Sequence, residues 1–238
     1  MPNDKSHLQE LCYQRNYDKY FNEYDWLTFL DIDEFIYLEE GSGYTTIQQF
    51  LDEPIFNDTD NIILTWKYYD DNGIIDVKDG NYSVLKRFTH QRFKKAEGDP
   101  NSLSKAIYRG KVNRNYIVGN HCIQGFQDYN GRKYVFRKAD GRIMKFKGIG
   151  WCFYNSNNTH FPVSIHHFET KSISEYINNK IKKHKFNSKY SLKHFFDKNN
   201  VTQEKVDYLK KELGELLKLS HMDIRPFEEM LYNKSKSC

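Results

Sequence analysis

The chain has 238 residues, of which 38% are hydrophobic and 16% aromatic, so it can bury a large core and form one α/β or α+β domain. Its 36 basic and 32 acidic residues leave a net charge of +4, too small to indicate nucleic acid as the main partner. It contains no run of about 18 apolar residues and no signal-peptide pattern at its start, so we expect a cytoplasmic protein. The four scattered cysteines are expected to be reduced thiols.

Apolar spacing predicts a helix near the start of the chain and a buried strand directly after it. The helix is expected to run from Ser6 to about Asn22. The strand, residues 26–30, is a compact apolar stretch that ends in Asp31-Ile32-Asp33. We therefore expect two carboxylates at the C-terminal edge of a strand.

The middle of the chain is predicted to be an antiparallel sheet. Residues 61–69 are rich in β-branched and aromatic residues and stop at the turn-forming cluster Asp70-Asp71-Asn72-Gly73. Further strands are expected at residues 82–88, 106–112, 116–122 and 134–137, with hairpin turns at Asn130-Gly131 and Asp140-Gly141.

The last third of the chain is predicted to contain one more strand and then helices. Residues 161–168 form the strand, and Ser172 and Glu175 have the spacing of a capping box that starts a helix at Ile173. Apolar spacing over residues 206–217 predicts an amphipathic helix capped by Thr202. The basic residues 180–185 either contact an anionic membrane surface or form a solvated helix face.

The pattern Asp31-Ile32-Asp33 is a candidate metal site. Carboxylate oxygens suit Mg²⁺ or Mn²⁺, and such an ion can neutralise a diphosphate. The same spacing recurs at Asp58-Thr59-Asp60, but only the first pair follows a buried strand, which favours it as the site. The alternative is a strand-end turn with solvated carboxylates.

Three other residues are candidates at the same site. His167 ends a predicted strand, where its imidazole could complete the metal shell, and His166 should point to the opposite face. Lys171 could reach a diphosphate as a point charge, or it is an ordinary surface lysine. His121 either binds donor or acceptor or is a hydrogen-bonded structural histidine.

A reaction in which a hydroxyl group attacks a carbon atom needs a carboxylate that accepts the proton of the hydroxyl group. Asp71, or else its neighbour Asp70, lies on a loop after a strand and is the candidate, although both residues also suit a plain turn. Trp66 could stack on a sugar ring, or it belongs to the core.

Several blocks resemble glycosyltransferases of family 92 and bacterial family 2-like enzymes of surface-polysaccharide synthesis. The segment DWLTFLDIDEFIYL (residues 25–38) is similar to their signature. The other similar blocks follow in the same order: WKYYDDNG (66–73), LKRF (85–88, with Lys86 replacing an acid), KAIYR (105–109) with Asn120-His121, and HFETKS (167–172) followed by Glu175-Tyr176.

The resemblance implies a GT-A-like fold, a mixed sheet flanked by helices, over residues 1–185, with a C-terminal helical extension at 186–238. It implies a nucleotide-sugar donor, which we expect to be a UDP-sugar, transfer with inversion, and Mn²⁺ or Mg²⁺ held by Asp31 and Asp33. From their positions in the sequence, we expect His167 to be a further metal ligand, and the donor to be contacted by Asp31, Lys171, His121 and Trp66. The acceptor is expected to be a glycan or lipid-linked glycan of polysaccharide or lipopolysaccharide synthesis, met at the inner face of the membrane.

Relative to that family, the strand-and-helix units before Trp26 are expected to be missing. The strand before Asp31 would then be an exposed edge, which favours a homodimer. An inactive fragment that acts as a binding module is the main alternative function. A metal-dependent hydrolase or nuclease that uses Asp31, Asp33 and Glu34 is a further alternative.

Overall fold

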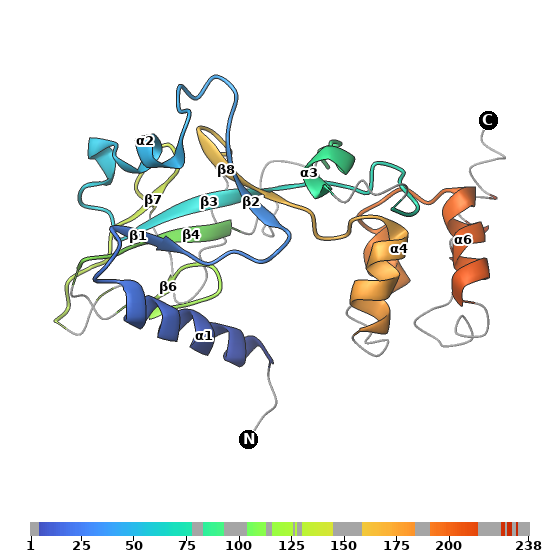
Figure 1. The fold of residues 1–238 in the computed structure, drawn as a ribbon, viewed down its shortest axis with the longest axis horizontal. Coiled ribbons are helices and arrows are strands. Elements are labelled where there is room, and N and C mark those ends of the chain that lie inside the picture. Colours follow the sequence, from blue (N-terminus) through green and yellow to red (C-terminus); the bar gives the residue numbers. More distant parts are fainter. Residues whose placement is uncertain are drawn as a thin grey trace. The chain divides into compact units, whose positions relative to one another are not determined.

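Figure 1 shows the computed structural model, which describes residues 5–77, 83–92, 104–112, 116–125, 127, 130–144, 159–183, 191–213, 225, 226, 228, 229 and 232. The chain divides into two compact units. The first consists of Met1–Lys67 and Lys94–His167, and the second of Tyr68–Phe93 and Phe168–Cys238. This division falls elsewhere than the predicted boundary at residue 185.

The first unit is built on a mixed sheet with the strand order β1-β4-β3-β8-β2, in which β7 lies beside β3 (Figure 1). Neighbouring strands β1 and β4, β3 and β4, and β2 and β8 are antiparallel. The strands are β1 (Trp26–Thr28), β2 (Glu34–Leu38), β3 (Asn61–Tyr68), β4 (Ser104–Arg109), β7 (Phe136–Lys138) and β8 (Val163–His167). A second sheet pairs β5 (Ile117–Val118) with β6 (Ile123–Gln124).

Strand β7 runs parallel to β3, so the prediction of an antiparallel middle region is wrong for this pair. The backbone N–H groups of Asp60 and Asn61 both donate to the Val135 carbonyl, which aligns the starts of the two strands. The predicted hairpin turn at Asp140-Gly141 is confirmed, because Gly141 has φ 81° and the Lys138 N–H donates to Arg142.

Helix α1 (Lys5–Tyr20) confirms the predicted first helix. Its residue Tyr17 is buried and belongs to the same core as Ile63 of β3 and Tyr108 of β4. Two short helices, α2 (Ile47–Leu51) and η1 (Pro54–Phe56), add the buried side chains of Phe50 and Phe56. The result is a mixed sheet flanked by helices, compatible with the GT-A-like fold.

Two predicted strands differ in the structure for local reasons. Within residues 82–88, Val84–Arg87 form one helical turn, α3, because the N–H groups of Lys86 and Arg87 both donate to the Ser83 carbonyl. The strand predicted at 106–112 ends at Arg109. There the Gly110 N–H donates to the backbone carbonyl of Asp25. A side chain at position 110 would collide with the Tyr24 carbonyl.

The second unit is helical. Its core contains apolar residues from α4 (Ile173–Tyr176), η2 (Ile177–Lys182, a π-helix), α5 (Leu192–Phe196) and α6 (Gln203–Leu213). The capping box of Ser172 and Glu175 is confirmed, and Thr202 caps α6 by accepting from the Lys205 N–H. None of the described helices has the length and apolarity needed to cross a bilayer.

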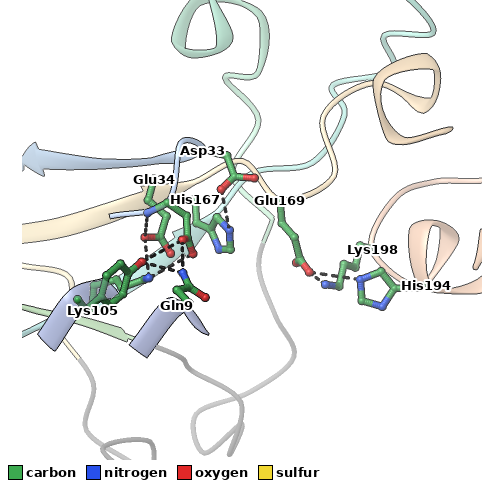
Figure 2. A network of polar contacts seen from close by, with 10 residues as sticks. Gln9, Asp33, Glu34, Lys105, His167, Glu169, His194 and Lys198 are labelled. Carbon is green, nitrogen blue, oxygen red and sulfur yellow. Dashed lines mark hydrogen bonds and ion pairs between the residues drawn. The ribbon is translucent and has the colours of Figure 1, made fainter. Parts of the chain in front are cut away.

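Partly buried ion pairs join separate segments of the second unit. Arg87 donates two hydrogen bonds to Glu175, at 2.7 and 2.9 Å, and thereby ties α3 to the start of α4. Glu169 forms an ion pair with Lys198 and lies 3.2 Å from the His194 ring (Figure 2).

The cysteines depart in part from the sequence prediction. Cys122 is buried and disulfide-bonded, so the expectation of reduced thiols is wrong at this position. Sequence spacing does not reveal which cysteines a fold brings within bonding distance. Cys12 on α1 is free and exposed, as expected.

Replacing Arg87 by Met should lower the free energy of unfolding by about 3 kcal/mol, because Glu175 would lose the partner of a largely buried charge. Burial favours a higher pKa for Glu175, but hydrogen bonds from Arg87 and Ser172 outweigh it and hold the pKa below the ordinary value. The pair therefore stabilises fully above that ordinary value and loses its effect as the pH falls through the lowered pKa.

Urea denaturation of both proteins at pH 7 and at about pH 3 measures this effect, and the difference between them should shrink at low pH. Lys193→Met, which removes an exposed pair with Asp197, is the control and should cost less than about 0.5 kcal/mol. An equal loss for Arg87→Met at both pH values would contradict the assigned pair.

Candidate functional site

The Asp31-Ile32-Asp33 motif lies in the turn that connects β1 to β2. The Glu34 N–H donates to the Asp31 carbonyl and closes this turn. Ile32 is 95% exposed at its tip, whereas Asp33 is buried and Asp31 is intermediate. The predicted position after a strand is confirmed, but the chain then enters a second strand, β2, that sequence reasoning did not predict.

Helix α1 holds the Asp31 carboxylate in place. Gln9 donates to Asp31 Oδ1 at 2.8 Å, and the Tyr13 hydroxyl donates to the same oxygen at 3.3 Å. The Tyr13 ring stacks on Phe29 with 4.7 Å between ring centres, which fixes its orientation. One carboxylate oxygen is thus engaged by the helix, while 43% of the Asp31 side chain remains exposed.

A buried lysine from β4 lies between two acids of the motif segment. Lys105 Nζ is 3.2 Å from Asp31 Oδ2 and 3.3 Å from Glu34 Oε2, and only 2% of its side chain is exposed. The side chain of Glu34 is fully buried. Figure 2 shows the side chains of Gln9, Glu34 and Lys105 close to one another.

The three charges respond differently to burial. Desolvation raises the pKa of Glu34 to about 7 because it exceeds the attraction of Lys105. Desolvation also acts to raise the pKa of Asp31, but the charge and hydrogen bond of Lys105 outweigh it, so this pKa lies below its usual value. Burial opposes the charge of Lys105, yet two neighbouring carboxylates still raise its pKa. Asp31 is therefore the fully ionised partner of Lys105 at neutral pH.

The pairing of β2 with β8 brings the third motif residue to a histidine. Glu34 is opposite His167 in the register, and Asp33 Oδ1 lies 3.8 Å from His167 Nε2. Both side chains point toward one another (Figure 2). The His167 ring also packs on Trp66 of β3, with 4.2 Å between ring centres.

His121 completes this group from the segment before β6. Its ring lies edge-on to Trp66 with 5.6 Å between ring centres, and its Nδ1 is 2.8 Å from the Ser104 carbonyl. Burial lowers the pKa of His121, which favours the neutral ring. Because a carbonyl only accepts, Nδ1 carries the proton in the neutral ring and the lone pair is on Nε2.

His166 has different neighbours from His167, as the alternation of side chains along a strand predicts. Its ring stacks on Tyr37 with 4.0 Å between ring centres, and its Nε2 is 3.9 Å from Glu39 Oε1. Burial lowers the pKa of His166 to about 4. His167, and not His166, therefore lies next to Asp33, and the choice of His167 as a metal ligand stays a prediction.

The two acids of the second Asp-x-Asp pattern, Asp58 and Asp60, bind side chains and backbone of other segments. Asp58 forms a two-pronged ion pair with Arg137. Asp60 is buried and accepts hydrogen bonds from the Tyr116 hydroxyl and the Val135 N–H. Both acids of this pattern thus have structural partners, and the preference for the first pattern as the metal site stays a prediction.

The candidate bases Asp70 and Asp71 lie in the second unit, in the predicted turn. Asp70 accepts from the Asn72 N–H and contacts His90, and Asp71 accepts from the Gly73 N–H. Asp71 also forms a fully buried ion pair with Lys205 of α6. The turn is confirmed, and a catalytic role for either carboxylate stays a prediction.

Lys171 also belongs to the second unit. It adopts a left-handed backbone conformation with φ 57°, directly before the Ser172 cap of α4. His167 and Lys171 are thus close in sequence but belong to different units. A contact of Lys171 with a diphosphate stays a prediction.

Sequence reasoning missed Lys105, Gln9 and Tyr13 as parts of the site. The signal for Lys105 was its place in a strand of otherwise apolar residues, because a lysine is almost never fully buried without a partner. Gln9 and Tyr13 lie one helical turn apart on α1, but their spacing does not reveal what they face.

The residues available for a divalent cation are few. Among the described residues, no group of three or more His, Cys, Asp or Glu side chains is arranged to hold a metal ion. The carboxylate of Asp33 and the imidazole of His167 are nevertheless both suitable ligands for Mn²⁺ and lie side by side. Asp31 is next to Asp33 in the same turn and is partly exposed.

Comparison with protein families identifies the class of protein to which this chain belongs. The model of glycosyltransferase family 92 matches residues 7–184, which include the Asp31 turn, Lys105, His121 and His167. The chain belongs to glycosyltransferase family 92 and is a transferase that takes nucleotide-sugar and acceptor substrates. A search of curated proteins found no match.

The hydrogen bond from Gln9 should stabilise the fold through the charged Asp31. We expect Gln9→Leu to lower the free energy of unfolding by about 1 kcal/mol, because one donor to a half-buried carboxylate is lost. Gln48→Leu is a matched control, since Gln48 donates to the exposed Asp52, and it should change stability by less than about 0.5 kcal/mol. Urea denaturation with unchanged m values measures both, and equal effects would argue against the contact.

Proposed function

We propose that this chain transfers a sugar from a UDP-sugar to a glycan or lipid-linked acceptor, with inversion at the sugar carbon. The supporting observation is that Asp31, Asp33, Trp66, His121 and His167 gather in one unit although they are far apart in sequence. Membership of family 92 supports the same activity. Synthesis of surface polysaccharide or lipopolysaccharide at the inner face of the cytoplasmic membrane is the setting that we propose.

A divalent cation, Mn²⁺ or Mg²⁺, would be held by Asp33 and His167, with Asp31 beside them. When bound, such an ion supplies positive charge that stabilises the diphosphate leaving group. The mixed oxygen and nitrogen ligands favour Mn²⁺ over Mg²⁺, which prefers oxygen alone. Asp31 has an exposed carboxylate edge that can also accept hydrogen bonds from hydroxyl groups of the donor.

The aromatic group beside the acids would position the donor. Trp66 offers an apolar ring, and neutral His121 offers Nε2 as an acceptor for a hydroxyl group. Lys171 is proposed to contact the diphosphate. Asp71, or Asp70 in its place, is proposed as the base that accepts the acceptor's proton.

The hydrolase interpretation would need Glu34 as a third exposed acid. The Glu34 side chain is instead fully buried against Lys105. This arrangement favours the transferase over that alternative.

Binding of UDP in the presence of Mn²⁺ tests the site. Asp33→Asn and His167→Gln should each weaken Mn²⁺-dependent UDP binding at least about tenfold, because each removes a proposed ligand. Asp58→Asn, which changes the other Asp-x-Asp pattern, should leave it unchanged. Calorimetry measures all four proteins. If the folded parent chain binds no UDP, the binding-module alternative gains support and the transferase proposal loses it.

Asp71 can be tested separately from the metal site. If the ion pair with Lys205 is chiefly structural, Asp71→Asn and Lys205→Met should each cost about 3 kcal/mol in stability, and the double variant should cost less than their sum. If Asp71 is the base, Asp71→Asn should in addition lower kcat far more than Lys205→Met does. Steady-state transfer rates and urea denaturation of the three variants distinguish the roles. Equal losses of kcat in the two single variants would remove Asp71 as the base.

A further inference from the structure

Asp31, Glu34 and Lys105 form a group that resembles a small cation-binding site, in which the ammonium group of Lys105 takes the place of a metal cation. Two carboxylates from one turn lie within 3.3 Å of a single ammonium group. The ammonium enters from β4, a different part of the chain, and its side chain is 2% exposed.

The second observation on this group is a buried carboxylate oxygen of Glu34. Its side chain is fully buried, and within the described part of the chain its Oε1 has no hydrogen-bond partner. Its other oxygen, Oε2, accepts from the Asp31 N–H at 2.9 Å and faces Lys105. A buried carboxylate oxygen without a donor favours a cation nearby, since burial of unpaired charge is costly.

We infer that Lys105 is a built-in cation that occupies the place between Asp31 and Glu34 which a divalent ion would otherwise take. Two positive charges cannot share this buried space without strong repulsion. The lysine therefore confines a divalent ion to the side of Asp33 and His167. A second consequence rests on the proposed function: because a metal ion is kept away from Asp31, the exposed part of its carboxylate can contact the donor. Lys105 is a positioning residue in this scheme.

The inference predicts a gain of metal binding when the lysine is removed. Lys105→Ala leaves the acids Asp31 and Glu34 with a space around them, and at a pH above the raised pKa of Glu34 the variant should bind about one more Mn²⁺ per chain than the parent. Adding Asp31→Asn to this variant should abolish the extra site. A lysine with a purely structural role would give no additional binding, because its removal would only destabilise the fold.

Mn²⁺ titration of the full chain, followed by the electron paramagnetic resonance signal of free Mn²⁺, counts the bound ions without any donor. Lys67→Ala is the matched control, because it removes a lysine that pairs with one acid, Glu39, among the described residues, and it should add no site. The stoichiometry of folded Lys105→Ala equal to that of the parent would overturn the inference.

If Lys105→Ala does not fold in metal-free buffer, its recovery of circular dichroism on addition of Mn²⁺ becomes the readout. Recovery supports the inference and failure to recover overturns it. The result would differ if the proposed transferase function were wrong and the inference on Lys105 correct. The parent would then bind no Mn²⁺ or UDP, while Lys105→Ala would still bind more Mn²⁺ than the parent.

Discussion

The antiparallel pairing of β2 with β8 is the constraint on which the candidate site depends. The chain leaves β1 at one edge of the sheet, makes the turn at Asp31 and Asp33, and enters β2 at the other end of the strand order. The register then sets Glu34 opposite His167. A shift of one residue would move His166 to that position and turn His167 to the other face, because side chains alternate along a strand. The metal and donor proposals therefore both depend on this register.

The blocks that resemble the family are joined in the structure by charged contacts. Lys105 from one block holds Asp31 of another. In the second unit, Arg87 of the LKRF block pairs with Glu175, which follows the HFETKS block. Segments that are distant in the sequence thus depend on one another through buried or half-buried charges, and removing one partner leaves the other charge unpaired. This dependence gives a physical reason for the blocks to occur together in one chain.

The sequence predicted the parts of the site that follow from local pattern. The choice of Asp31 and Asp33 over Asp58 and Asp60 rested on a preceding apolar strand, and in the structure Asp33 of the first pair lies beside His167. That this pair binds a metal ion stays a prediction. The sequence could not predict partners from other elements, such as Gln9 on α1 or Lys105 on β4, because they meet Asp31 only after the sheet has formed. The strand at β7 was predicted, but its parallel direction was missed because it depends on β3, a distant part of the chain. The helical turn α3 was missed for a local reason, since the N–H groups of Lys86 and Arg87 donate to the Ser83 carbonyl.

The environment of Asp31 differs from that of Asp33 although only one residue separates them. Asp31 is already compensated by Lys105 and held by α1, so its charge adds little attraction for a further cation. Asp33 has the imidazole of His167 beside it, and an imidazole can itself be a metal ligand. The spacing of an Asp-x-Asp motif therefore does not make its two acids equivalent. In this fold the elements that face the turn give each acid different surroundings, and for this reason we propose a donor contact for Asp31 and a metal contact for Asp33.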